Sequence, residues 1–130
     1  MNTNYGFGKP VSGDFDAAVQ NVIDELKQEG FGVLSDIDVA ATLKAKIDED
    51  IPPYRILGAC NPKLAHQAVT AVPEIGLLLP CNVLVREDEA GQVHVSFMDP
   101  GAVLGLVDKA EIEPLAQQVT AKLNRVLAAL

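Results

Sequence analysis

The chain has 130 residues, of which 48% are hydrophobic and 22% charged, and its 10 basic and 18 acidic residues give a net charge of −8. This length predicts one domain covering residues 1–130. The negative charge argues against nucleic acid and anionic membranes as partners, because phosphate groups would be repelled. No run of about 18 apolar residues occurs and residues 1–10 lack a signal-peptide pattern, so we expect a cytoplasmic protein that is not embedded in a membrane.

The first predicted helix covers residues 14–29, where apolar side chains recur at helical spacing. Ser12 or Asp14 can cap its first amides, and Gly30 can supply the left-handed residue that ends it. The segments on either side, residues 4–9 and residues 31–37, have the character of strands.

Two further helices and a strand are predicted in the middle of the chain. Asp38 can cap a second helix with one apolar side, and the apolar segment 54–59 reads as a central strand of a sheet. Asn61 can cap a third helix that runs to about residue 72, because Pro62 suits the first helical position.

The second half of the chain predicts a hairpin and a long final helix. Strands at residues 81–86 and 92–98 are separated by a short polar turn. Residues 99–101 form an Asp-Pro-Gly turn, in which Asp99 can accept backbone hydrogen bonds. A helix with an apolar stripe follows from about residue 113 to residue 130.

The predicted order of elements is therefore β-α-β-α-β-α-β-β-α. The strands are too unevenly spaced for a doubly wound parallel sheet. We expect an α+β fold, in which a mixed or antiparallel sheet carries helices packed mainly on one face.

Four phrases spread over nearly the whole chain resemble the family called domain of unknown function 302. In the order of the chain they are GFGVLSDIDV at 30–39, YRILGACNP at 54–62, LPCNV at 79–83 and MDP at 98–100. The resemblance implies a compact α+β fold that tends to form homodimers. It implies no reaction, because no activity is established for the family at large.

Two cysteines are the chemically suggestive residues. They are too few for a disulfide scaffold, so in a reducing compartment they are free thiols, a metal pair or a redox pair. Cys60 directly precedes the cap of a helix, whose positive end favours a thiolate. Cys81 stands in a similar turn, and adjacent strands can bring the two thiols together. The candidate ligand-binding residues are Cys60, Asn61, Cys81, Asn82 and Met98.

Both thiols also have a purely structural interpretation, as small buried hydrophobic side chains. His66 falls on the outward side of the third helix, so it is not expected to act as a base for Cys60. His94 falls on the solvent side of the hairpin; it could be a ligand together with Met98, but an exposed surface histidine is the favoured interpretation. A zinc site is not favoured, because the chain has no CxxC motif. No catalytic residue or metal ligand is assigned from the sequence, and the cofactor is left open.

Three functions are compatible with these features. The first is a binding module that holds a small molecule or a soft metal near the two cysteine turns. The second is a dimer-forming structural or interaction domain in which both thiols are buried. The third is a thiol-dependent redox protein or enzyme, which ranks last because no base is evident beside Cys60.

Overall fold

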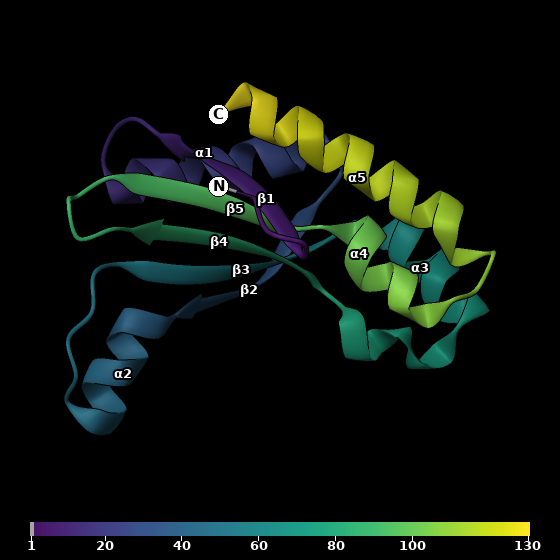
Figure 1. Ribbon diagram of the computed structural model, residues 1–130, viewed down its shortest axis with the longest axis horizontal. Coiled ribbons are helices and arrows are strands. Elements are labelled where there is room, and N and C mark those ends of the chain that lie inside the picture. Colours follow the sequence, from purple (N-terminus) through teal and green to yellow (C-terminus); the bar gives the residue numbers. More distant parts are fainter. Residues whose placement is uncertain (1) are drawn as a thin grey trace.

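Five strands form one antiparallel sheet in the computed structural model, which describes residues 2–130 (Figure 1). Their order across the sheet is β1-β5-β4-β3-β2, and each strand runs antiparallel to its neighbours. The expected α+β fold is therefore confirmed. The strands are β1 (Gly6–Val11), β2 (Gly32–Asp38), β3 (Tyr54–Cys60), β4 (Cys81–Glu87) and β5 (Val93–Met98).

The helices begin and end where the sequence places capping residues. Asp14 Oδ1 accepts a hydrogen bond from the Ala17 amide at 2.7 Å, and Asp38 Oδ1 accepts one from the Ala41 amide at 2.9 Å. Gly30 has a φ of +84°, the left-handed conformation expected after the first helix. The α-helices are α1 (Phe15–Gln28), α2 (Val39–Ile47), α3 (Pro62–Ala71), α4 (Pro100–Leu104) and α5 (Ile112–Ala129), and the 3₁₀ helices are η1 (Pro73–Leu78) and η2 (Gly105–Val107).

The core lies between one face of the sheet and the helices α1 and α5. Val83 and Val85 of β4 are fully buried on this face, as are Val95 and Phe97 of β5, while the residues between them are half-buried or exposed. Helix α1 packs against β4 and β2, and α5 packs against α1, α3 and α4. The alternation of buried and more exposed residues along β4 and β5 follows from the two-residue period of a strand, which sends successive side chains to opposite faces.

The remaining helices lie beyond the ends of the strands (Figure 1). Helices α3 and α4 lie beneath α5 at the end of the sheet where β3 finishes and β4 begins, and α2 lies near β2 at the other end. No residue of α2 is buried, although its sequence has an apolar side. The end of the sheet that carries α3 and α4 is the part of the fold that brings the two cysteine turns together.

Two details differ from the sequence-based expectations. The Asp-Pro-Gly segment is not only a turn, because it starts the short helix α4, whose first amides donate to Asp99 Oδ1. The middle strand of the sheet is β4, and β3 is the interior strand next to it. Within residues 2–130, no helix combines the length and the apolar character needed to cross a membrane.

Candidate functional site

The turn between β3 and α3 is held by Asn61. Its side-chain oxygen accepts a hydrogen bond from the Leu64 amide at 3.3 Å, and its side-chain nitrogen donates to the Glu29 carbonyl oxygen at 3.5 Å. Pro62 occupies the first helical position, where its missing N–H leaves no donor unsatisfied. Asn61 therefore caps α3 and also ties it to the end of α1. Cys60, immediately before it, is half-buried with a free thiol.

Cys81 begins β4 directly across from the end of β3. Its cross-strand partner is Ala59, which places it one residue away from Cys60 in the ladder. Cys81 is only 5% exposed. Burial raises the pKa of its thiol from the ordinary 9.0 to about 11, and the neighbouring Cys60 adds to the increase. Cys81 is therefore a protonated, neutral thiol at physiological pH.

The register does not favour a disulfide between the two cysteines. Cross-strand partners share a face of the sheet and successive residues alternate between faces, so Cys60 starts from the face opposite to that of Cys81. A disulfide requires Cβ atoms about 4 Å apart that point toward each other. The two cysteines lie one position out of register at one end of the sheet, and both are free thiols.

Both cysteines line one cavity of about 330 Å³ at this end of the sheet. Its walls come from the start of β2, the end of β3, helix α3, η1 and the segment after it, the start of β4, and helices α4 and α5. The lining side chains are mainly aliphatic, and several of them also belong to the core, such as Leu64, Leu115 and Val119. At the mouth, Leu34 is 71% exposed and Val69 is 44% exposed. The cavity thus runs from an apolar rim to the hydrophobic core.

The structure places three of the five candidate ligand-binding residues around this cavity, namely Cys60, Asn61 and Cys81. The other two, Asn82 and Met98, are not among its lining residues. Asn82 is exposed, because it follows Cys81 in the strand and so points to the other face. Met98 lies at the end of β5, where its cross-strand partner is Gly6 of β1.

The lining residues contributed by α4 and α5 were not identified from the sequence. Leu104, Leu115 and Val119 look like ordinary core positions on amphipathic helices. No local pattern distinguishes a leucine that packs against protein on every side from one that borders a cavity. Only the packing of α5 over α3 makes these side chains part of the site.

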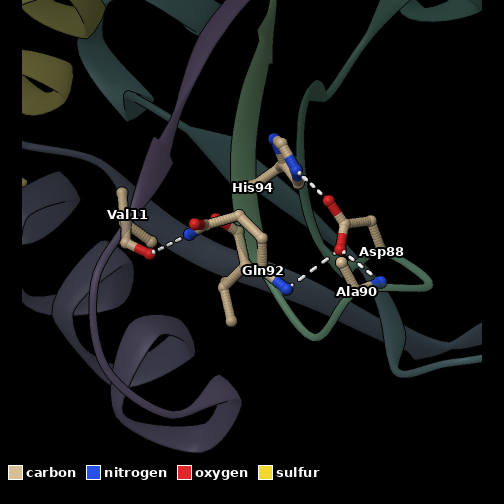
Figure 2. A network of polar contacts seen from close by, with 6 residues as sticks. Val11, Asp88, Ala90, Gln92 and His94 are labelled. Atoms are coloured by element: carbon tan, nitrogen blue, oxygen red, sulfur yellow. Dashed lines mark hydrogen bonds and ion pairs between the residues drawn. The ribbon is translucent and has the colours of Figure 1, made fainter.

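A polar cluster lies at the β4–β5 hairpin (Figure 2), and none of its labelled residues lines the cavity. His94 Nε2 lies 2.8 Å from Asp88 Oδ2, and Asp88 Oδ1 accepts hydrogen bonds from the amides of Ala90 and Gln92, each at 2.9 Å. Gln92 Nε2 also donates to the Val11 carbonyl oxygen at 2.7 Å. The hydrogen bond from His94, with those from the backbone, lowers the pKa of Asp88. This cluster closes the hairpin and ties β1 to it.

Neither histidine is placed to activate Cys60. His66 is exposed on α3, as expected from its position on the outward side of the helix. The His94 side chain is 16% exposed, so it is more buried than a solvent-facing histidine, and it does not line the cavity. Its other ring nitrogen, Nδ1, is buried without a hydrogen-bond partner among the described residues. The contact of its Nε2 with Asp88 gives the histidine a structural role in the hairpin.

A larger hollow of about 1000 Å³ lies between α4, η2 and α5. Its lining includes three carboxylates, Asp99, Asp108 and Glu113, together with Lys109. Asp99 already caps α4, and the Thr120 hydroxyl donates to the Ala116 carbonyl oxygen of its own helix. The hollow has no cysteine or histidine in its lining, so the thiol-containing cavity is the stronger candidate site.

The family model described as "Domain of unknown function DUF302" matches residues 7–130 of the chain. The chain belongs to the DUF302 family. A crystal structure of an uncharacterized conserved DUF302 protein from Bacillus stearothermophilus is similar, with a TM-score of 0.89 and 26% identity, over 96% of this chain and 97% of that one. An uncharacterized protein from Aquifex aeolicus (strain VF5) is 30% identical over 69 residues, which cover 52% of this chain and 46% of the Aquifex protein.

Membership in the DUF302 family establishes the fold and assigns no activity. The matched Bacillus stearothermophilus structure and the Aquifex aeolicus protein are both described as uncharacterized. The function of this chain therefore depends on the chemistry of its own cavity.

Proposed function

We propose that the chain is a small-molecule binding module, whose ligand occupies the cavity lined by Cys60 and Cys81. The observation that carries the proposal is the cavity itself, with a volume of about 330 Å³, an apolar lining and an exposed mouth. Natural ligand sites are concave, mostly apolar and roughly 300–1000 Å³ in volume, with only a few polar groups. The cavity has these properties.

The side chains available to bind a ligand in the cavity favour a small molecule over a soft metal ion. No group of three or more His, Cys, Asp and Glu residues that could hold a metal occurs in the described part of the chain. A cysteine binds metal as a thiolate, and the raised pKa of Cys81 opposes that form. The two cysteines alone would leave a soft metal with an incomplete set of protein ligands.

Binding is also favoured over thiol catalysis. An activated cysteine needs a base within hydrogen-bond reach, about 3 Å. The residues that line the cavity include no histidine, lysine, aspartate or glutamate. Cys60 is therefore proposed as a contact for the ligand, and no catalytic role is assigned to it.

A fragment screen tests the binding function. Isotope-labelled protein would be titrated with mixtures of neutral and charged fragments while its backbone amide signals are followed by NMR. We expect binding fragments to shift the amide signals of cavity residues. Ala65→Leu should abolish these shifts, because Ala65 lines the cavity and is half-buried. Ala71→Leu is the matched control, because Ala71 is exposed on the same helix and does not line the cavity.

The binding function would be contradicted if no fragment shifted the amides that line the cavity. Shifts confined to the larger hollow between α4 and α5 would also contradict it, because they would place the ligand site elsewhere. Shifts that survived in Ala65→Leu would show that the fragments bind outside the cavity.

Formation of a homodimer is a second candidate role, and apolar side chains on the face of the sheet opposite α1 and α5 support it. The register aligns Ile37, Ile56 and Leu84 in one apolar row across β2, β3 and β4 on this face. Ile37 is 49% exposed, and Ile47 of the nearby helix α2 is 62% exposed. Exposed apolar side chains that lie together mark interaction surfaces. We propose that a second copy of the chain covers this row.

Sedimentation velocity over a range of concentrations tests the homodimer. We expect the wild-type chain to associate, and Ile37→Lys to be monomeric with an unchanged circular dichroism spectrum. Leu106→Lys is the control, because Leu106 is 76% exposed in η2, outside the sheet. A wild-type chain that stays monomeric throughout, or an Ile37→Lys variant that still associates, would refute this assembly.

A further inference from the structure

The cavity has no charged residue in its lining. None of its sixteen lining residues is Asp, Glu, Lys, Arg or His, although the chain as a whole has 28 acidic and basic residues. A charged ligand group buried there would lose its hydration without gaining an opposite charge. We propose that the ligand is a compact, uncharged and largely aliphatic molecule, an inference that rests on the binding function proposed above.

The start of α3 does not offer an anion site in place of charged side chains. Free backbone amides at a helix N-terminus commonly bind phosphate or carboxylate groups. Here Pro62 has no N–H, the Leu64 amide donates to Asn61 Oδ1, and the Ala65 amide donates to the Asn61 carbonyl oxygen at 2.8 Å. Of the first three residues of the helix, Pro62 therefore has no N–H and the Leu64 amide is already hydrogen-bonded. The helix end is poorly suited to an anionic ligand.

The polar groups in the wall allow only weak polar recognition. The side-chain oxygen and nitrogen of Asn61 both make hydrogen bonds within the protein. The Cys81 thiol is buried and protonated. The half-buried Cys60 thiol is the remaining side-chain polar group in the lining, and a thiol is a weak hydrogen-bond donor. A ligand with many hydroxyl groups, such as a sugar, would leave most of them unsatisfied.

The size and the lining of the cavity indicate a compact aliphatic ligand. Its volume of about 330 Å³ is roughly twice that of the engineered protein cavity of about 150 Å³ that binds benzene. Phe31 is its one aromatic lining residue, so a flat ring would find little stacking surface. Branched side chains such as Leu115 and Val119 form the inner wall. A rounded aliphatic molecule therefore fits the lining better than a nucleobase or a flavin.

Three adamantane derivatives test the ligand class, because they share one rigid aliphatic cage and differ in charge. Adamantane carboxamide is neutral, adamantane carboxylate is anionic and adamantyl ammonium is cationic at neutral pH. We expect the carboxamide to shift the amide signals of the cavity residues and to bind about tenfold or more tightly than either ion, because an ion loses hydration on entry. Ala65→Leu should abolish this binding and Ala71→Leu should preserve it.

The outcomes separate the ligand class from the binding function. Equal or tighter binding of the carboxylate or the ammonium ion in the cavity would overturn the uncharged class and leave the binding function standing. The class would also be overturned if none of the three bound while other fragments shifted the cavity amides. Failure of all fragments would overturn both. Cavity amides that shifted with protein concentration alone would instead show that a second copy fills the cavity, which also overturns the ligand class.

Discussion

The position of Cys81 in the sheet determines the chemistry of its thiol. It lies opposite Ala59 on the core face, where it is 5% exposed, and burial raises the pKa of its thiol to about 11. Cys60, the neighbouring thiol, is half-buried at the wall of the same cavity. Two cysteines in similar sequence contexts therefore differ in access to solvent, because one faces the core and the other does not.

The raised pKa of Cys81 predicts a loss of stability in alkaline solution. Because the pKa of this thiol is higher in the folded than in the unfolded protein, its contribution to stability is fully present below pH 9.0 and is lost as the pH rises toward about 11. We expect this loss to lower the free energy of unfolding by about 2 to 3 kcal/mol. Urea denaturation between pH 8 and pH 11 measures the change.

Cys81→Val is the control for this alkaline transition, because valine has a similar size and does not titrate. Other groups of the protein also titrate in this range, so the informative quantity is the difference between the wild type and the variant. We expect the variant to lose less free energy of unfolding between pH 9 and pH 11. Identical pH profiles for the two proteins would contradict the burial of this thiol.

At the scale of elements, strand β1 depends on a close approach to β5. Gly8 lies opposite Ser96, and a Cβ atom on Gly8 would overlap the Val95 carbonyl oxygen and lie 2.7 Å from Ser96 Cα. Both atoms belong to the backbone, so a side-chain rotation cannot relieve the overlap. The absence of a side chain at this position lets the edge strand join the sheet in its observed register.

Gly8→Ala should therefore destabilise the protein by about 1 to 3 kcal/mol, the usual cost of overpacking. Chemical denaturation measures this loss, and hydrogen exchange at β1 should accelerate. Gly105→Ala is the matched control, because Gly105 has a helical backbone conformation and no atom near the added methyl group. Equal stabilities of the two variants would rule out the close approach of β1 to β5.

The helices differ in how firmly they are attached to the rest of the fold. Helix α1 contributes four buried residues to the core, including Val22 and Leu26, which are 0% exposed. Helix α2 contributes none, and its contacts are mainly with β3. A helix of nine residues has little stability of its own without tertiary packing. Helix α2 is therefore expected to have a lower local stability than α1.

For the whole molecule, we predict an order of opening measurable by native-state hydrogen exchange. The amides of β4, the middle strand, should exchange only through global unfolding, because Val83 and Val85 are fully buried and both edges of the strand are paired. The amides of α2 should exchange through local opening and much faster. Helix α1 serves as the reference, and equal protection of α1 and α2 would contradict the prediction.

Much of the fold was predictable from the sequence because its signals are local. Asp14 and Asp38 cap the first two helices, Gly30 ends the first, and Asn61 with Pro62 begins the third. Each depends on residues a few positions apart in the chain. The extent of α4 was missed, because a turn and a short helix begin with the same Asp-Pro-Gly pattern and differ only in the contacts that follow.

The candidate site was predicted in part, and its residues show where local reasoning ends. Cys60, Asn61 and Cys81 border one cavity, as the similar turns suggested, whereas Asn82 and Met98 do not. Asn82 was included for its place beside Cys81, but successive residues of a strand point to opposite faces. Its neighbour in sequence therefore belongs to the other side of the sheet.

The sequence by itself determined the α+β class, the order of the elements, their caps and the membership of the family, because these depend on short patterns of residues. Only the tertiary structure decided the strand order, the burial of Cys81 beside the half-buried Cys60, and the cavity that both thiols share. The physical reason is that register and cavity shape arise from packing between residues far apart in the chain. The contributions of α4 and α5 to the cavity wall exist only once the helices have packed together.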